Sequence, residues 1–442
     1  VLEAKGTLDQ LAMFYTSLYH TMINPSVYMD VDGRYRGLDH NIHTSEGFTN
    51  YTIFSLWDTY RAEHPFLNLL KPRQNTDMVQ SMIRHQQQSV HGMLPVWSLM
   101  GNEGWCMSGY HAVSVLADAI TKGVFSNVDE ALSAMVSTST VPYYEGVADY
   151  MKLGYIPLDK SGTAASSTLE YAYDDWCISI FAEAMSDFET KAKYERFAKA
   201  YEFYFDKSTR FMRGLDSKGE WRTPFNPRAS THRSDDYCEG TAWQWTWFVP
   251  HDVDGLVNLM GGEDAFVQKL DSLFTVDSSL EGEMISSDIS GLIGQYAHGN
   301  EPSHHVIHLY NYVNRPWRTQ ELVDSVYQSQ YANSTDGLSG NEDCGQMSAW
   351  YILNSMGFYQ VCPGKPIYSI GRPAFDKAVI NLPEEKTFSI VVKNNEKKNK
   401  YIESVTLNGQ PLNTPFFHHQ DIANGGTMEI KMTAQPTKWG VR

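Results

Sequence analysis

Residues 8–22 read LDQLAMFYTSLYHTM, and this stretch begins the pattern that decides the fold class. Its apolar residues recur at helical spacing, and Pro25 ends the pattern. Similar stretches follow as far as about residue 359, separated by loops rich in Gly, Pro and Asn. They are residues 48–64, 76–91, 109–122, 128–137, 166–186, 191–206, 243–260, 264–274, 319–331 and 347–356.

These stretches predict a mainly α fold with roughly a dozen helices. They share no fixed sequence period, so a solenoid is not favoured. Helices in consecutive hairpins suit a closed double ring, the (α/α)6 barrel, whose loops at one end form a cleft. The polar motifs of this chain fall between the predicted helices, where such a cleft is expected.

After about residue 363 the pattern changes from helical to extended. Four segments alternate or are rich in β-branched residues, with NG and GG turns between them: 377–381, 387–393, 401–407 and 427–432. We therefore expect a small C-terminal antiparallel β domain. The predicted parts are an N-terminal helix or linker, the helical barrel and the β domain, at residues 1–36, 37–362 and 363–442.

Composition and charge exclude several classes of function. The chain has 52 acidic and 35 basic residues and a formal net charge of −17, which argues against nucleic acid as a partner. We find no apolar run of about 18 residues, so we expect no membrane span. The first residues, VLEAKGTLDQ, lack the pattern of a signal peptide. Most of the 11 Trp and 26 Tyr are expected in the core, and some in a cleft where rings stack on sugars.

The five cysteines are scattered and include no CxxC pair, which argues against a zinc site. An odd number leaves at least one free thiol unless one pairs with another chain. The positions are Cys106, Cys177, Cys238, Cys344 and Cys362.

The first polar motif is LWDTYR at residues 56–61. We interpret Asp58 as an acceptor for sugar hydroxyls, with Trp57 or Tyr60 stacking on the ring. The alternative is that Asp58 caps a helix or pairs with Arg61.

The second motif, YCEGTAWQWTWFVPHD at residues 237–252, places Glu239 just before a cluster of tryptophans. A carboxyl beside apolar rings is poorly solvated, so its pKa rises and it can hold a proton near neutral pH. That suits a general acid. The alternative is that the tryptophans belong to the core and Glu239 is an exposed loop residue.

The third motif is GQYAHGNEPSHH at residues 294–305. Asn300 and Glu301 offer hard oxygen ligands in a loop flanked by Gly and Pro, which suits calcium. The spacing of His298, His304 and His305 matches no standard zinc pattern, so we expect them to form hydrogen bonds. The alternative for Asn300 is a helix N-cap.

The fourth motif, GLSGNEDCGQMSAW at residues 337–350, places Asp343 between a Gly-rich loop and a predicted helix. One acid there would commonly cap the helix. Two adjacent acids, Glu342 and Asp343, with Gln346 one turn on, favour a polar site. Glycoside hydrolysis needs one protonated carboxyl and one ionised carboxylate, which Glu239 and Asp343 can supply if folding brings them together.

Five motifs in order resemble glycoside hydrolase family 92. They are LWDTYR with the following HP, TLEYAYDDW at residues 168–176, EGTAWQWTWFVPHD, GQYAHGNEPSHH and GNEDCGQMSAWY. The resemblance runs from about Gly37 to the C-terminus. It implies an (α/α)6 catalytic barrel accompanied by β domains, in a secreted, periplasmic or cell-surface protein.

The resemblance also implies an inverting, calcium-dependent exo-α-mannosidase that removes terminal α-mannosyl residues from N-glycans or mannans. Glu239 would be the general acid and Asp343 the general base. Calcium would bind the 2- and 3-hydroxyls of mannose, with the metal ligands Asn300, Glu301 and Asp343. The substrate-binding residues would be Trp57, Asp58, Glu301 and His304.

Two departures from the family pattern weaken the expectation of an active enzyme. Some members carry an acid where this chain has Asn341. The family usually has a large β-sandwich domain before the barrel, whereas this chain starts almost at the predicted barrel, so we expect that domain to be missing. The alternatives are a non-catalytic glycan-binding fragment, another (α/α)6 glycosidase, or a sugar epimerase in which His carries the proton.

Overall fold

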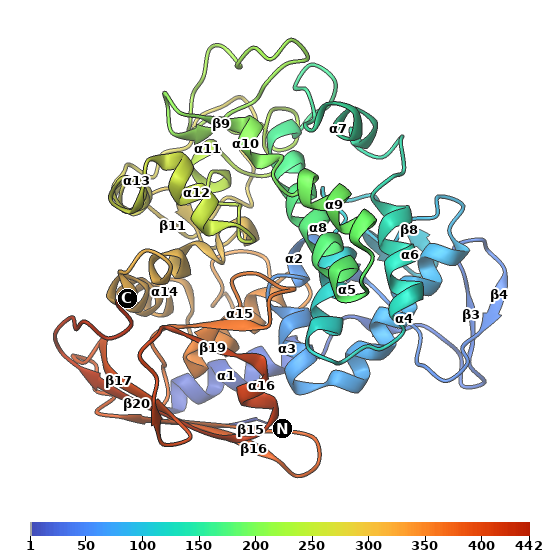
Figure 1. Ribbon diagram of the computed structural model, residues 1–442. Coiled ribbons are helices and arrows are strands. Elements are labelled where there is room, and N and C mark those ends of the chain that lie inside the picture. The colour runs from blue at the N-terminus through green and yellow to red at the C-terminus, as the bar shows by residue number, and fades with distance from the viewer. Residues whose placement is uncertain (1) are drawn as a thin grey trace.

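The structure is a computed structural model that describes residues 2–442, and helices dominate it up to residue 356 (Figure 1). The α-helices are α1 (Leu8–His20), α2 (Leu56–Thr59), α3 (Glu63–Leu70), α4 (Pro72–Gln88), α5 (Ala112–Thr121), α6 (Val128–Thr138), α7 (Val147–Leu153), α8 (Ala164–Ala184), α9 (Phe188–Phe197), α10 (Tyr201–Tyr204), α11 (Ala242–Trp245), α12 (Val253–Met260), α13 (Glu263–Thr275), α14 (Pro316–Gln330), α15 (Gln346–Met356) and α16 (His419–Ala423). The 3-10 helices are η1 (Glu301–Ser303) and η2 (Val306–Asn311).

The largest sheet has six strands in the order β1-β15-β16-β20-β17-β18. Its strands are β1 (Leu2–Lys5), β15 (Lys377–Asn381), β16 (Thr387–Lys393), β17 (Tyr401–Leu407), β18 (Gln410–Pro411) and β20 (Gly426–Thr433). The remaining strands pair in small groups: β2 (Ser26–Val27), β3 (Arg34–Arg36), β4 (Ile42–Thr44), β5 (Tyr51–Thr52), β6 (Phe54–Ser55), β7 (Trp97–Leu99), β8 (Asn102–Glu103), β9 (Phe205–Asp206), β10 (Phe211–Met212), β11 (Leu292–Ile293), β12 (Tyr296–Ala297), β13 (Phe358–Tyr359), β14 (Ile367–Ile370) and β19 (Phe416–His418).

The mainly helical class is confirmed, but three predicted helices are wrong over part of their length. The one predicted at residues 191–206 divides into α9, α10 and strand β9. The predicted helix at residues 48–64 begins as strands, because Ser26 pairs with Thr52 and Phe54 pairs with Ser98. Here pairing with distant strands overrides the helical pattern. The predicted helix at residues 243–260 is broken between α11 and α12, where Pro250 interrupts the helical hydrogen bonding.

The C-terminal strands form where the alternation predicted them, but the sheet is mixed and not purely antiparallel. Strands β16 and β20 run parallel, with Phe388 opposite Gly426, whereas the other pairings of this sheet are antiparallel. The N-terminal segment, which we expected as helix or linker, adds the edge strand β1, with Leu2 opposite Ile380. Figure 1 accordingly shows the N-terminus beside the sheet.

Helix α14 anchors the sheet to the helical part of the chain. Its buried residues Thr319, Leu322, Val323 and Val326 recur at helical spacing. Its polar side chains reach strand β17: the N–H of Ile402 donates to Gln320 Oε1 at 2.9 Å. The sheet is therefore tied to the helical part of the chain through the contacts of β17 with α14.

Two of the helices that lie in the interior position the candidate site. All residues of α15, and all but four of the 21 residues of α8, are buried. A helix that is buried on every side has no polar face for solvent, so its polar side chains must find partners inside the protein. Glu170 of α8 and Gln346 of α15 are two such residues. Among residues 2–442, no helix is both long enough and apolar enough to cross a bilayer.

Candidate active site

Three carboxylates from three distant motifs meet in the interior. One oxygen atom each of Asp58, Glu301 and Asp343 lies within 4.8 Å of the others. Asp58 and Glu301 are fully buried, and Asp343 is half-buried. Within residues 2–442, Asp58 Oδ1 and both carboxylate oxygens of Glu301 have no hydrogen-bond partner. Unpaired buried carboxylate oxygens at this spacing fit a hard divalent cation.

Burial and mutual repulsion make these carboxyls poor acids. Burial raises the pKa of Asp58 well above its ordinary range, and the charge of Asp343 raises it further. Burial likewise raises the pKa of Glu301, with Asp58 and Asp343 acting in the same direction. Like charges in a buried cluster favour either protonation or the binding of a cation.

Glycines explain how the third and fourth motifs come into contact. A Cβ atom on Gly340 would lie 2.2 Å from the carbonyl oxygen of Gly299, and one on Gly299 would lie 2.7 Å from that of Ser339. Only residues without a side chain permit this close approach of two backbones. The contact places Glu301, two residues after Gly299, beside the loop that carries Asp343.

The capping role expected for an acid before α15 belongs to Glu342. Its Oε2 accepts a hydrogen bond from the N–H of Gly345 at 2.7 Å, and its Oε1 accepts one from Ser348 at 3.3 Å. Asp343 is therefore not needed as a cap. Burial raises the pKa of Asp343 to about 6, and Glu342 and Asp288 act in the same direction.

Glu239 lies in the loop before α11, with only 4% of its surface exposed. Burial raises the pKa of Glu239 to about 7, as do the charges of Asp288 and Asp343, while Arg233 lowers it. The direction agrees with the expectation from the tryptophan cluster. Trp245 is fully buried and donates its indole N–H to the carbonyl of Cys238 at 2.8 Å, which fixes the loop.

Glu239 and Asp343 share an unusual backbone conformation. Their φ angles are +42° and +52°, in the left-handed region that residues with a side chain seldom adopt. Such conformations cost roughly 1–3 kcal/mol each and concentrate at functional sites.

Asn300 connects Glu239 with the carboxylate cluster. It occupies the N-cap position of η1, but its side-chain amide donates to the carbonyl oxygen of Glu239 at 2.7 Å and does not cap the helix. Asn300 therefore lies at the N-cap position, as the alternative stated, but its side chain does not form the capping hydrogen bond.

The histidines of the third motif form hydrogen bonds, as expected. His304 Nε2 lies 3.1 Å from the carbonyl oxygen of His298, and His304 Nδ1 lies 3.0 Å from Gln346 Nε2. The Gln346 side chain in turn accepts from the N–H of Ala62 at 2.8 Å. Burial lowers the pKa of His304 to about 3, so the ring is neutral. His304 holds the Glu301 loop against α15 from a fully buried position.

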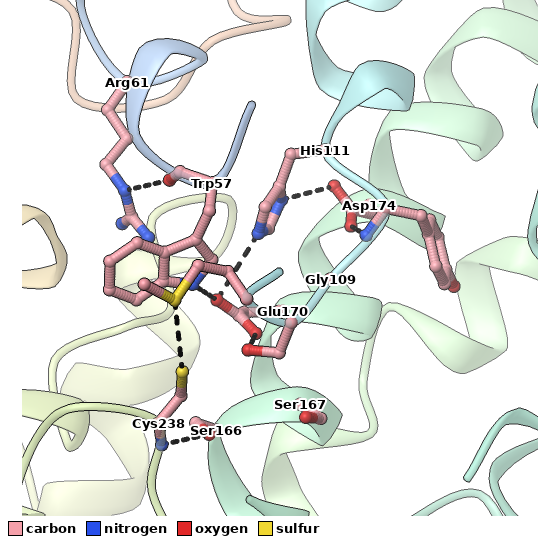
Figure 2. A network of polar contacts seen from close by, with 12 residues as sticks. Trp57, Arg61, Gly109, His111, Ser166, Ser167, Glu170, Asp174 and Cys238 are labelled. Atoms are coloured by element: carbon pink, nitrogen blue, oxygen red, sulfur yellow. Dashed lines mark hydrogen bonds and ion pairs between the residues drawn. The ribbon is translucent and has the colours of Figure 1, made fainter. Parts of the chain in front are cut away.

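Trp57 is only 1% exposed and belongs to a buried polar network (Figure 2). Its indole N–H donates to Glu170 Oε1 at 2.6 Å, and the hydroxyl of Ser108 donates to Glu170 Oε2 at 2.6 Å. His111 lies between two carboxylates, 3.4 Å from Glu170 and 3.0 Å from Asp174. The network thereby fixes Trp57, the neighbour of Asp58, to α8.

His111 carries a positive charge in this network. Burial alone would lower the pKa of His111, but the carboxylates of Asp174 and Glu170 outweigh it and raise the pKa to about 9. Figure 2 also shows Cys238, whose N–H donates to Ser166 Oγ of α8 at 2.9 Å. Cys238 precedes Glu239, so α8 supports the loops of both Asp58 and Glu239.

Sequence reasoning missed two residues beside Glu239. His232, Glu239 and Asp288 each offer an atom within 4.8 Å of the others, and His232 Nδ1 lies 3.6 Å from Glu239 Oε1. Asp288 also accepts a hydrogen bond from Asn341 at 3.1 Å. No sequence signal marked Asp288, which stands alone in the loop SSDISG.

The site combines Glu239, with a pKa of about 7, Asp343, with a pKa of about 6, and a carboxylate cluster suited to a cation. Glycoside hydrolases use two carboxyls with different pKa values for acid–base catalysis. The comparison with known families agrees. The Glycosyl hydrolase family 92 catalytic domain matches residues 1–434, and the chain therefore belongs to this family.

Solved structures of this family are similar along the whole chain. A family GH92 α-mannosidase from Bacteroides thetaiotaomicron, in complex with mannoimidazole, is 42% identical with a TM-score of 0.96, covering 100% of this chain and 59% of that one. A family GH92 inverting mannosidase from the same organism is 35% identical with a TM-score of 0.89, covering 100% of this chain and 62% of that one.

One curated relative also matches. It is an uncharacterized secreted glycosidase from Arthroderma benhamiae, 29% identical over 388 residues, which cover 79% of this chain and 48% of the relative. The chain thus spans about half the length of this relative.

Proposed function

We propose that the chain is the catalytic part of a secreted inverting exo-α-mannosidase that removes terminal α-mannosyl residues from N-glycans or mannans. The proposal rests mainly on Glu239 and Asp343, two carboxyls with raised pKa values and left-handed backbone. Asp343 also belongs to the carboxylate cluster with Asp58 and Glu301. Support for mannose comes from the solved family members, which are mannosidases and include a complex with mannoimidazole. Support for secretion comes from the secreted glycosidase relative.

Glu239 acts as the general acid in this proposal. With a pKa of about 7 it retains its proton near neutral pH and can transfer it to the glycosidic oxygen as the bond breaks. Asp343, with a pKa of about 6, is largely ionised at the same pH and takes a proton from the attacking water. Water that attacks on the face opposite the leaving group inverts the anomeric centre.

Asn300, Glu301 and Asp343 are the proposed ligands of a calcium ion. The fit rests on the unpaired oxygens of Glu301, on the position of Asp343 beside Glu301, and on the hard oxygen donors that all three residues offer. When bound, calcium supplies positive charge that holds the 2- and 3-hydroxyls of mannose. Asp58, whose Oδ1 has no hydrogen-bond partner, is the proposed acceptor of a sugar hydroxyl. Trp57 and His304, proposed as substrate-binding residues, are buried with protein partners. In this proposal they act on the substrate by holding the loops of Asp58 and Glu301 in place, and Trp57 does not stack on the sugar.

The proposed architecture is an (α/α)6 barrel at residues 37–362 and a β domain at residues 363–442, to whose sheet the N-terminal segment, residues 1–36, adds strand β1. The close structural similarity to the family members supports the barrel. The buried histidines do not favour an epimerase, since burial lowers the pKa of His304 to about 3 and that of His305 to about 4.

The test is hydrolysis of an α-mannobiose, followed by proton NMR of the sugar first released. We expect β-mannose to appear first. Glu239→Gln and Asp343→Asn should each lower kcat on the disaccharide by roughly 100-fold or more, because each removes a proton-transfer group. Near-UV circular dichroism should remain unchanged. Release of α-mannose would reject inversion, and retention of most activity in either variant would reject its assigned role.

A further inference from the structure

One buried carboxyl beside the candidate site has no role in the proposed mechanism. Glu63, the first residue of α3, is fully buried. Within residues 2–442, neither of its carboxylate oxygens has a hydrogen-bond partner. A buried polar group without a partner destabilises the folded protein. Stability therefore does not account for a glutamate at this position.

Glu63 lies against the turn that carries the proposed general base. A Cβ atom on Gly345 would lie 2.7 Å from Glu63 Cδ and 2.8 Å from Glu63 Oε2. The carboxyl group therefore packs directly onto the backbone of Gly345, two residues after Asp343. The starts of α3 and α15 are also joined, because Gln346 Oε1 accepts from the N–H of Ala62 at 2.8 Å and from that of Glu63 at 3.2 Å.

The turn before α15 has an unfavourable backbone. Asp343, Cys344 and Gly345 have φ angles of +52°, +57° and +100°, so three consecutive residues are left-handed. This conformation is unfavourable for the two residues that have a Cβ atom, and it persists only where neighbouring groups hold it. Glu342 holds the turn from within, through the hydrogen bond that it accepts from the N–H of Gly345. Glu63 contacts the same turn from α3.

The Glu63 carboxyl is uncharged in this position. Burial raises the pKa of Glu63 well above its ordinary range, and the charge of Glu342 raises it further. A protonated carboxyl and a primary amide have nearly the same size, carry no charge, and offer both a donor and an acceptor. Glutamine is therefore the conservative replacement, whereas alanine removes the contact with the turn.

We propose that Glu63 is a positioning residue, whose side chain supports the turn of residues 343–345 and so fixes the general base in the site. The inference rests on the proposed function in one respect, the role of Asp343 as the base. Glu63 acts through the turn and not on the substrate, so its loss affects the rate of hydrolysis and not the affinity for substrate.

The kinetic test compares Glu63→Ala with Glu63→Gln on an α-mannobiose. Glu63→Ala should lower kcat about tenfold or more and leave KM within about twofold, because a displaced base slows the attack of water without removing a substrate contact. Glu63→Gln should keep kcat within about twofold of the wild type. Unchanged kcat in Glu63→Ala, or an equal loss in both variants, would overturn the proposal.

Leu270→Ala is the control for a general loss of packing, since Leu270 is fully buried on α13, away from α3 and the turn. It should lower the urea midpoint of unfolding and leave kcat within about twofold. If Leu270→Ala lowers kcat as much as Glu63→Ala does, the effect of Glu63 is one of stability and the positioning role is rejected.

Labelling of Cys344 tests the turn without turnover. Cys344 is half-buried, and burial raises its pKa to about 12, so its thiol should react slowly with iodoacetamide. In Glu63→Ala, with calcium present, its labelling measured by mass spectrometry should rise several-fold relative to Cys106, which lies between β8 and α5. Glu63→Gln should label as the wild type does. An unchanged ratio in Glu63→Ala overturns the support of the turn, whereas absence of hydrolysis in the wild type rejects the proposed function and leaves the labelling to decide on the turn.

Discussion

Glu239 and Asp343 differ from ordinary loop acids in burial and raised pKa, and both have left-handed backbone. Each property has a separate cause. The pKa values follow chiefly from burial, at about 7 and about 6. The backbone angles follow from the surrounding loops, which hold Glu239 through Asn300 and cap α15 through Glu342. Because the surroundings give the two carboxyls different pKa values, the one with the higher pKa, Glu239, is the candidate acid and Asp343 is the candidate base.

The pKa of Glu239 predicts an upper pH limit for activity. Activity requires ionised Asp343 and protonated Glu239, and calcium bound to Asp343 keeps that carboxylate ionised below its metal-free pKa of about 6, so kcat/KM should fall as pH rises through about 7. A pH profile of kcat/KM between pH 4 and 9 checks this. In Glu239→Gln, measured with an activated aryl α-mannoside that needs no protonation, the fall above pH 7 should disappear. A flat profile in the wild type would contradict the assignment of Glu239.

At the scale of elements, helix α8 supports the site through a charged network that has no contact with solvent. His111, Glu170 and Asp174 are all fully buried, and Trp57 and Tyr110 donate to the two carboxylates. A buried ion pair of this kind adds little net stability, but removal of one partner leaves a buried charge. The network therefore makes the position of the loops sensitive to a single substitution.

Asp174→Ala should destabilise the protein by about 3–5 kcal/mol, because it leaves His111 charged and incompletely paired. The pKa of His111 in the folded state, about 9, exceeds its ordinary value of 6.5. Its contribution to stability is therefore complete below pH 6.5 and is lost as pH rises through about 9.

Urea unfolding at pH 6, 7.5 and 9 measures this contribution. The control is Asp264→Ala, because the Asp264 side chain on α13 is 99% exposed. This substitution should change the free energy of unfolding by no more than about 0.5 kcal/mol. The prediction fails if Asp174→Ala unfolds at the same urea concentration as the wild type at pH 6.

At the scale of the whole molecule, the site depends on segments that are distant in the chain. Asp58 follows β6, Glu301 opens η1 and Asp343 precedes α15. Their like charges oppose folding, so a cation held by Glu301 and Asp343, beside Asp58, stabilises the folded state. Removal of that cation should thus affect stability as well as turnover.

Calcium should raise the melting temperature of the protein, and a chelator should abolish both this rise and mannoside hydrolysis. At a calcium concentration about 100 times Kd, the gain is about 2.7 kcal/mol. Differential scanning calorimetry with and without chelator checks the effect. Glu301→Gln should remove most of the gain, whereas Asp264→Asn should keep it. Unchanged melting and turnover in excess chelator would reject the metal role.

The pattern of the chain predicted elements better than it predicted their pairing. The strands at 377–381, 387–393 and 401–407 were found with the predicted bounds because alternation of apolar residues marks a half-buried strand. The parallel contact of β16 with β20 and the addition of β1 were not predicted, since pairing partners leave no mark in a local pattern. The helix at 48–64 failed for the same reason: strand pairing competes with helical spacing there.

The sequence by itself determined the helical class, the family and the acidic motifs, because periodicity and order of motifs are properties of the chain alone. Only the tertiary structure decided which acids meet. It separated Glu342, which caps α15, from Asp343, and it brought Asp288 to Glu239. The physical reason is that pKa, burial and close backbone approach depend on neighbours supplied by distant segments.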